Sequence, residues 1–262
     1  MSVKLEDANI NRFDKITRIA NLNPLYCRET DSLSSVIDKI LELKHRRIPV
    51  VSKDMVLTGI VTYMDILDGL LRGQTKDMQI SSIMVRDIIS CDSDDMISYV
   101  LQKLKMSRRG GIPITRNKRL IGIVSEKDFV RLFAKIKFDM PVKDAMTPRP
   151  FFISKRFSIL DCLKSMVNTH YRRLPVVENN TLIGIVTAFD IVEYIREHDY
   201  DLKAMNEPLD FVVKDAFTIS EKEDVSDVVN LMKDKDIGGL LVVKDKKLEG
   251  IITERDILEQ IV

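Results

Sequence analysis

The stretch RRLPVV at residues 172–177, followed after a polar turn by GIVTAFDIV at 184–192, recurs with small changes along the chain. Each copy ends in a hydroxyl residue followed three positions later by an aspartate, and successive motifs lie 62 to 66 residues apart. Self-similarity at a fixed period indicates a repeat architecture, in this case one unit present four times. The other copies join RRIPVV (46–51) to GIVTYMDIL (59–67), GGIPIT (110–115) to GIVSEKDFV (122–130), and GGLLVV (238–243) to GIITERDIL (250–258).

The same order of elements is predicted in every copy. In the third, apolar residues at helical spacing (Leu160, Leu163 and Met166) predict an amphipathic helix ahead of the Pro-Val-Val strand. A short extended segment precedes that helix, and a second strand leads into the hydroxyl-x-x-Asp motif, which opens another helix. The predicted unit is β-α-β-β-α, an α/β fold, and its copies span residues 14–72, 80–136, 142–198 and 207–262.

A unit of about sixty residues cannot bury both faces of its three-stranded sheet alone and is marginally stable by itself. Tandem copies are therefore expected to pack sheet to sheet, in two pairs. Short polar connectors at 73–79 and 199–206 are interpreted as joins within the pairs, and 137–141 as the join between them.

Composition argues against several classes of protein. Lys plus Arg number 41 against 40 Asp plus Glu, a net charge of +1, so no bulk attraction to nucleic acid or to a membrane surface is expected. No apolar run approaches the roughly 18 residues of a membrane span, and the first residues lack a signal-peptide pattern, which predicts a cytoplasmic protein. Three cysteines without paired spacing (Cys27, Cys91 and Cys162) predict buried reduced thiols rather than disulfides or a metal site.

Catalytic motifs are not found in the sequence. It has no Ser-His-Asp or Cys-His arrangement, no glycine-rich phosphate loop and no HExxH pair, so a non-catalytic protein with no catalytic residues is predicted. Of three histidines, His45 and His170 fall at duplicated positions typical of binding, and His198 lies in a connector.

The Pro-Val-Val strand and the GIVTxxD junction closely resemble the CBS domain, the cystathionine β-synthase motif, from about residue 14 to 262. Four such repeats with no other domain resemble the γ subunit of AMP-activated protein kinase and its stand-alone archaeal relatives. The resemblance implies two Bateman modules of two repeats each, assembled into a disc, with adenine nucleotides in the clefts between paired repeats. It implies AMP, ADP or ATP as regulatory ligand with no other cofactor, an unidentified regulated protein as partner, and a homodimer.

The hydroxyl-x-x-Asp motif suits a nucleotide on chemical grounds. An aspartate one turn into a helix can accept two hydrogen bonds from a ribose diol, and the preceding hydroxyl can meet a phosphate at the positive end of the helix. The alternative is a capping box, which duplication would preserve equally well. The predicted ribose ligands are Asp65, Asp128, Asp190 and Asp256, and the predicted phosphate ligands include Thr62, Ser125, Thr187 and Thr253.

Basic residues are distributed unevenly among the copies. Copies one and three carry the pairs Arg46-Arg47 and Arg172-Arg173, where copies two and four have glycine pairs (110–111 and 238–239). Copies two and four instead place Lys127 and Arg255 inside the motif. Arginine forks match phosphate oxygens, and the resemblance assigns all six basic residues to phosphates; solvated surface charges are the alternative. The glycines either let backbone approach a ligand closely or bend the chain.

For the adenine, the resemblance points to two positions in each copy. One lies near the first short strand (Asn21, Val85, Thr147 and Val213), and only Thr147 keeps the hydroxyl seen in the family. The other lies four residues before the proline position. The predicted adenine contacts are Thr147, Phe151, Tyr171, His45 and Ile237, and Arg109 occupies the remaining position.

A regulatory nucleotide sensor is the leading hypothesis, and two alternatives stay open. An S-adenosyl compound, such as S-adenosylmethionine or methylthioadenosine, would use the same aspartates but needs no arginine pairs. A nucleic-acid or protein scaffold with empty clefts would use a basic patch such as Lys103, Lys105, Arg108 and Arg109. The balanced charge and the absence of Trp argue against nucleic acid.

Overall fold

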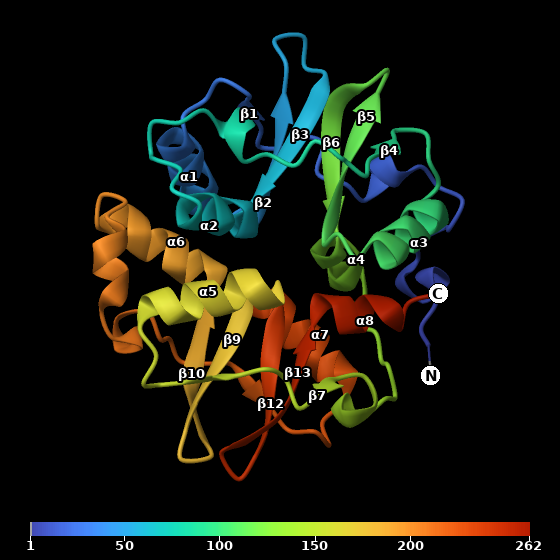
Figure 1. Cartoon of the computed structure of the whole chain (residues 1–262). Coiled ribbons are helices and arrows are strands. Elements are labelled where there is room, and N and C mark those ends of the chain that lie inside the picture. The colour runs from blue at the N-terminus through green and yellow to red at the C-terminus, as the bar shows by residue number, and fades with distance from the viewer. Residues whose placement is uncertain (1) are drawn as a thin grey trace.

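The computed structural model describes residues 2–262 and shows four copies of one β-α-β-β-α unit, as predicted (Figure 1). Unit 1 contains β1 (Cys27–Arg28), α1 (Leu33–Glu42), β2 (Arg47–Val51), β3 (Leu57–Thr62) and α2 (Tyr63–Leu71). Unit 2 contains β4 (Cys91–Asp92), α3 (Ile97–Ser107), β5 (Gly111–Arg116), β6 (Arg119–Ser125) and α4 (Glu126–Leu132). Unit 3 contains β7 (Thr147–Pro148), β8 (Ile153–Ser154), α5 (Ile159–Thr169), β9 (Arg173–Glu178), β10 (Thr181–Thr187) and α6 (Ala188–Glu197). Unit 4 contains β11 (Thr218–Ile219), α7 (Val225–Asp234), β12 (Gly239–Lys244), β13 (Lys247–Thr253) and α8 (Glu254–Glu259).

Every unit has the same sheet. Its short first strand runs parallel to the second, which pairs antiparallel with the third, giving the orders β1-β2-β3, β4-β5-β6, β8-β9-β10 and β11-β12-β13. The parallel pair needs a crossover, and the amphipathic helix of each unit provides it. The strand β7 of unit 3 joins the edge of the unit 4 sheet, beside β13.

Units 1 and 2 form one pair, and units 3 and 4 the other, which confirms the two predicted Bateman modules. The segment ahead of each unit adds a short antiparallel bridge to the third strand of its partner. These reciprocal bridges join Asn21 to Ile123, Val85 to Ile60, Thr147 to Ile251, and Lys214 to Ile185.

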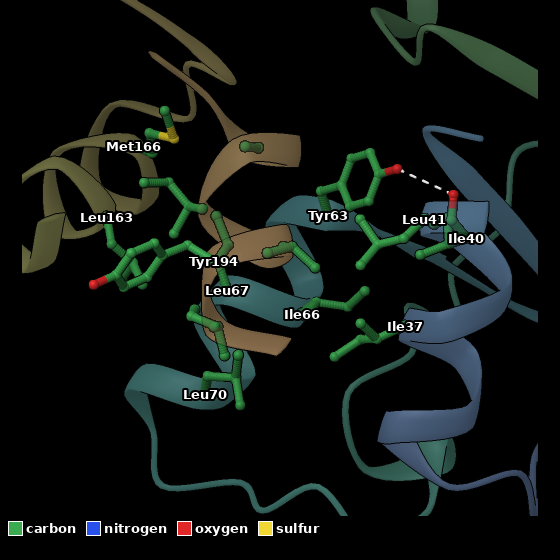
Figure 2. Close-up of a cluster of buried hydrophobic side chains, with 14 of the residues drawn as sticks. Ile37, Ile40, Leu41, Tyr63, Ile66, Leu67, Leu70, Leu163, Met166 and Tyr194 are labelled. Carbon is green, nitrogen blue, oxygen red and sulfur yellow. Dashed lines mark hydrogen bonds between the residues drawn. The ribbon is translucent and has the colours of Figure 1, made fainter. Parts of the chain in front are cut away.

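The apolar cores, in contrast, cross from one module to the other. Helices α1 and α2 share a buried cluster with α5 and α6, whereas α3 and α4 share a second cluster with α7 and α8. The helices lie between the two modules, with the strands turned outward (Figure 1). Figure 2 draws Ile66 and Leu67 of α2 in the same buried cluster as Tyr194 of α6. Each module therefore buries its helical faces against the other module.

Two segments outside the predicted repeats also enter these cores. The connector 199–206 was predicted to be a polar join, but it contains the 3-10 helix Leu202–Asn206, and its Met205 is fully buried with units 1 and 3. Near the start of the chain, Leu5 is buried in the second core and Val3 pairs with Ile261 in a parallel bridge. Further 3-10 turns cover Leu5–Ala8, Ile16–Arg18, Ile80–Ser82, Val142–Asp144 and Leu209–Phe211.

None of the described helices is both long and apolar enough to cross a bilayer. The three cysteine side chains are buried, as predicted, and burial raises the pKa of each thiol to about 12.

All three thiols are expected to resist iodoacetamide in the folded protein at neutral pH, because the reactive species is the thiolate and burial suppresses it. Mass spectrometry after a timed incubation should show no alkylation of native protein and three modified cysteines after unfolding in guanidinium. Rapid alkylation of Cys27, Cys91 or Cys162 in the native protein would contradict the buried positions.

Candidate functional site

The four hydroxyl-x-x-Asp motifs all adopt the capping-box arrangement. In each, the third strand ends at the hydroxyl residue, the following helix begins at the next residue, and the aspartate is the third residue of that helix. The aspartate Oδ2 accepts the backbone N–H of the hydroxyl residue at 2.7 Å and its O–H at 2.6–2.7 Å. The capping box, which was the alternative to ribose binding, is thus present. It uses only Oδ2 of each aspartate and leaves Oδ1 available to a second partner.

At the motif of unit 4, Oδ1 of Asp256 has a partner from the other repeat of its module. It accepts a hydrogen bond of 3.0 Å from Oγ1 of Thr147, which lies on β7 of unit 3. The predicted adenine hydroxyl and the predicted ribose carboxylate therefore come together. Two further predicted adenine contacts of unit 3, Phe151 and Tyr171, have ring centroids 6.4 Å apart and are about half exposed.

The motif of unit 3 is different because Asp190 faces a lysine. Nζ of Lys214 lies 2.6 Å from Oδ1 of Asp190 and 3.2 Å from Oε2 of Glu193, and it also lies 5.6 Å from the ring centroid of Phe189. Burial favours the neutral amine, but the hydrogen bonds to Asp190 and Glu193 outweigh it and raise the pKa of Lys214. Asp190 is only 6 % exposed, so this carboxylate is covered.

Lys214 of unit 4 occupies the position equivalent to that of Thr147 in unit 3. Counting back from the first short strand suggested Val213, which is wrong by one residue. The bridges place Thr147 opposite Ile251 and Lys214 opposite Ile185, each two residues before the motif hydroxyl. The segment between this position and the first short strand is one residue shorter in unit 4 than in unit 3. An alignment of the copies that assumes constant spacing therefore misses Lys214.

The two motifs of the first module have other residues at this position. Asn21 lies beside the strand that leads to Asp128, and Val85 beside the strand that leads to Asp65. Burial raises the pKa of Asp65, although its hydrogen bonds to Thr62 and the charge of Arg109 act in the opposite direction.

The other predicted adenine residues occupy different environments. Burial, with a smaller contribution from the charge of Lys127, lowers the pKa of His45. Ile237 packs against the core shared by units 2 and 4, where it offers apolar contact alone.

The four predicted phosphate arginines meet where the four units join, and we call Arg46, Arg47, Arg172 and Arg173 the central arginine cluster. Their guanidinium groups pack against glycines of the other repeats. A Cβ on Gly110 would lie 2.6 Å from Nη2 of Arg47, and one on Gly238 would lie 2.7 Å from Nη2 of Arg173. The glycine pairs therefore make room for arginines of neighbouring units, a role that neither sequence interpretation anticipated.

Two buried glutamates accompany the central arginine cluster. Glu126 begins α4 and Glu254 begins α8, and each is only 3 % exposed. Arg46 is ion-paired with Glu254, Nη2 of Arg172 lies 3.9 Å from Oε2 of Glu126, and Nη1 of Arg255 lies 3.3 Å from Oε1 of Glu126.

The cluster has more positive charge than these carboxylates balance. Burial, together with the charge of neighbouring arginines, lowers the pKa of Arg47 to about 10 and that of Arg173 to about 9. Within residues 2–262, Nη1 of Arg47 is buried without a hydrogen-bond partner, and so is Oε1 of Glu254. Buried donors of this kind are normally satisfied, so the cluster has free capacity for an anion.

Lys127 and Arg255, also predicted to bind phosphate, connect unit 2 to unit 4. Nη1 of Arg255 donates 2.9 Å to the carbonyl of Leu104, at the carboxyl end of α3, where a cation is favourable. Nζ of Lys127 lies 2.5 Å from Asp236, just after α7. Their assignment to phosphate stays a prediction.

Sequence reasoning missed three charged residues, namely Lys214, Glu126 and Glu254. A signal for the glutamates was present, because SEKD and TERD in copies two and four replace TYMD and TAFD of copies one and three. The acid therefore appears in the copies that lack an arginine pair.

A family model described as the CBS domain matches residues 16–72, 80–135, 142–197 and 209–262. The chain belongs to the CBS-domain family. Among curated relatives, this CBS-domain protein is 26 % identical to the uncharacterized protein MJ1225 of Methanocaldococcus jannaschii, over 94 % of this chain and 99 % of the relative. It is 27 % identical to an uncharacterized 33.4 kDa protein from Thermofilum pendens, over 88 % and 86 % of the two chains.

Solved structures agree with this assignment of the fold. The crystal structure of MJ1225, described as a candidate archaeal homologue of γ-AMPK, superimposes with a TM-score of 0.87 at 24 % identity, over 94 % of this chain and 99 % of that one. An uncharacterized conserved protein from Pyrococcus horikoshii superimposes with a TM-score of 0.64 at 19 % identity, over 94 % and 99 %. These likenesses concern the arrangement of all four repeats.

Proposed function

We propose that this CBS-domain protein is a non-catalytic regulatory module that binds an adenine nucleotide (AMP, ADP or ATP) and modulates a partner protein. The observation that carries the proposal is the pair formed by Thr147 of unit 3 and Asp256 of unit 4. Glu254, which contacts the central arginine cluster, lies two residues before Asp256 on α8. The predicted ribose carboxylate and a glutamate that contacts the central arginine cluster are therefore two residues apart on one helix.

The chemistry of binding follows from these groups. Oδ1 of Asp256 would exchange the hydroxyl of Thr147 for the hydroxyls of a ribose, a charge-assisted contact. The rings of Phe151 and Tyr171 offer apolar faces to a base. The α-phosphate and any further phosphates would extend toward the guanidinium groups at the centre.

Regulation would proceed by a shift of population between module arrangements. The central arginine cluster contains residues of both modules, so an anion bound there contacts both at once. A coupling free energy of about 1–3 kcal/mol between nucleotide and partner is ordinary for such a device. We also propose that the partner is a regulated protein, and that the chain forms a homodimer.

A thermal-shift panel on nucleotide-stripped protein tests the proposal, with AMP, ADP, ATP, adenosine, S-adenosylmethionine and methylthioadenosine. A ligand present at 100 times its Kd stabilises the fold by about 2.7 kcal/mol, a visible rise in Tm. We expect this rise with at least one phosphate-bearing nucleotide, and we expect Asp256→Ala to abolish or strongly reduce it. The exposed Asp54→Ala serves as matched control. A rise with methylthioadenosine or S-adenosylmethionine alone would favour the S-adenosyl alternative, and no rise with any ligand would favour the scaffold.

Lys214→Thr is expected to let a nucleotide reach Asp190, because it removes the ammonium that lies against Oδ1 and copies the threonine found opposite Asp256 in the other half of the module. Isothermal titration calorimetry with ADP should then give one more bound nucleotide per chain than the wild-type protein. The exposed Lys222→Thr should leave the stoichiometry unchanged. An unchanged stoichiometry in Lys214→Thr would show that the lysine does not exclude the nucleotide.

A further inference from the structure

Glu126 and Glu254 are buried acids at the first position of helices α4 and α8, in the centre of the molecule. The corresponding residues of units 1 and 3 are Tyr63 and Ala188, neither of which carries charge at neutral pH. The acids therefore belong to the two units that lack an arginine pair, and they lie against the arginines of the two units that have one.

The contacts of the two glutamates with the central arginine cluster connect different modules. Arg46 of the first module contacts Glu254 of the second, and Arg172 of the second contacts Glu126 of the first. The charges of Arg46 and Arg173 outweigh the effect of burial and lower the pKa of Glu254, so it is ionised at neutral pH. Buried charges of this kind depend on their partners, because an isolated one is strongly unfavourable.

The hydrogen bonds of this centre are incomplete. Nη1 of Arg47 and Oε1 of Glu254 are both buried, and within residues 2–262 neither has a partner. Glu254 accepts a hydrogen bond from Arg46, whereas Glu126 lies 3.9 Å from Arg172, so the carboxylates satisfy only part of the donor capacity of the four guanidinium groups. A phosphate offers more acceptor oxygens and more negative charge than a carboxylate, in a geometry that arginine forks match.

We propose that Glu126 and Glu254 are internal counter-anions, which a ligand phosphate displaces from the central arginine cluster, so that phosphate binding releases the ion pairs joining the two modules. For nucleotides this inference rests on the function proposed above, and for the bare anion it does not. A released glutamate remains next to bound phosphate and is repelled by it. The two modules therefore change their relative position when phosphate enters, and a ligand with more phosphate charge displaces the glutamates more completely.

Calorimetric titrations of Glu126→Gln, Glu254→Gln and the double variant test this inference, with inorganic tripolyphosphate, ADP and adenosine as ligands. Removing the competing charge is expected to tighten binding of tripolyphosphate and ADP about tenfold or more per glutamate, equivalent to about 1.4 kcal/mol each. Adenosine, which has no phosphate, should bind each variant as it binds the wild type. Glu42→Gln, at the exposed end of α1, is the matched control and should change nothing.

Unchanged or weaker binding of tripolyphosphate in the glutamine variants would overturn the inference, and so would a failure of every form to bind it. If the wild-type protein binds tripolyphosphate but no adenine compound, the proposed function is wrong. The tripolyphosphate titrations then still decide whether the glutamates compete with phosphate for the central arginine cluster. Should a glutamine variant not fold, Glu126→Asp and Glu254→Asp retract the carboxylate and keep its charge. These aspartate variants are expected to tighten tripolyphosphate binding by a smaller factor, and an absence of tightening would contradict the inference.

Discussion

Replacing Leu67 with alanine is expected to lower the free energy of unfolding by about 2–5 kcal/mol, the range found for buried leucines. Leu67 of α2 is completely buried in the core that units 1 and 3 share (Figure 2). The truncation removes apolar contacts and leaves a cavity between helices of different modules. Urea unfolding followed by circular dichroism measures the change.

The control for Leu67→Ala is Leu43→Ala, a leucine just after α1 that is 52 % exposed. It should change the free energy of unfolding by at most about 0.5 kcal/mol, as surface substitutions do. A Leu67→Ala protein as stable as the wild type would contradict a core shared between the modules. A loss confined to one of two separate unfolding transitions would mean that the modules unfold independently, contrary to the continuous core.

The double variant Arg172→Ala/Arg173→Ala is expected to weaken binding of AMP about 100-fold or more, while adenosine affinity stays nearly constant. Hydrogen bonds to charged groups contribute about 1.5–3 kcal/mol each, and this variant removes half of the central arginine cluster. Titration calorimetry with both ligands at the same salt concentration measures the difference.

Arg119→Ala, at the exposed start of β6, is the control and should bind both ligands as the wild type does. Equal weakening of AMP and adenosine in the double variant would indicate a structural defect rather than a lost phosphate contact. Unchanged binding of AMP would remove the arginine cluster from the ligand site. Circular dichroism of the variant distinguishes a folding failure from a binding failure.

Local sequence signals explain why so much of the fold was predictable. Apolar spacing on each helix, alternating strands and the capping motif are encoded within a few residues, and four copies supply the same signal independently. The pairing of units 1 with 2 and 3 with 4 follows from their order along the chain. Asp256 and Thr147 were both predicted as ligand contacts from the sequence, and the structure adds that their side chains meet.

The features that escaped prediction depend on contacts between distant parts of the chain. Lys214 was overlooked because one missing residue before a two-residue strand shifts the alignment, which only the backbone bridge to Ile185 shows. Met205 looked like part of a polar connector, because a single methionine carries no periodicity. The glycine pairs had two local explanations, and the structure adds a third that is not local, because their neighbours are arginines of other units.

The sequence by itself determined the repeat, the order of elements in each unit, the two modules and the chemical types of residue at the motif, because each depends on local propensity or on short-range spacing. Tertiary structure alone decided that the apolar cores cross between modules and that four arginines converge on two buried glutamates. It also decided that Asp190 faces a lysine whereas Asp256 faces a threonine. The physical reason is that burial and the pairing of charges depend on which surfaces meet when the two modules dock, and the order of residues within one unit does not specify its partner.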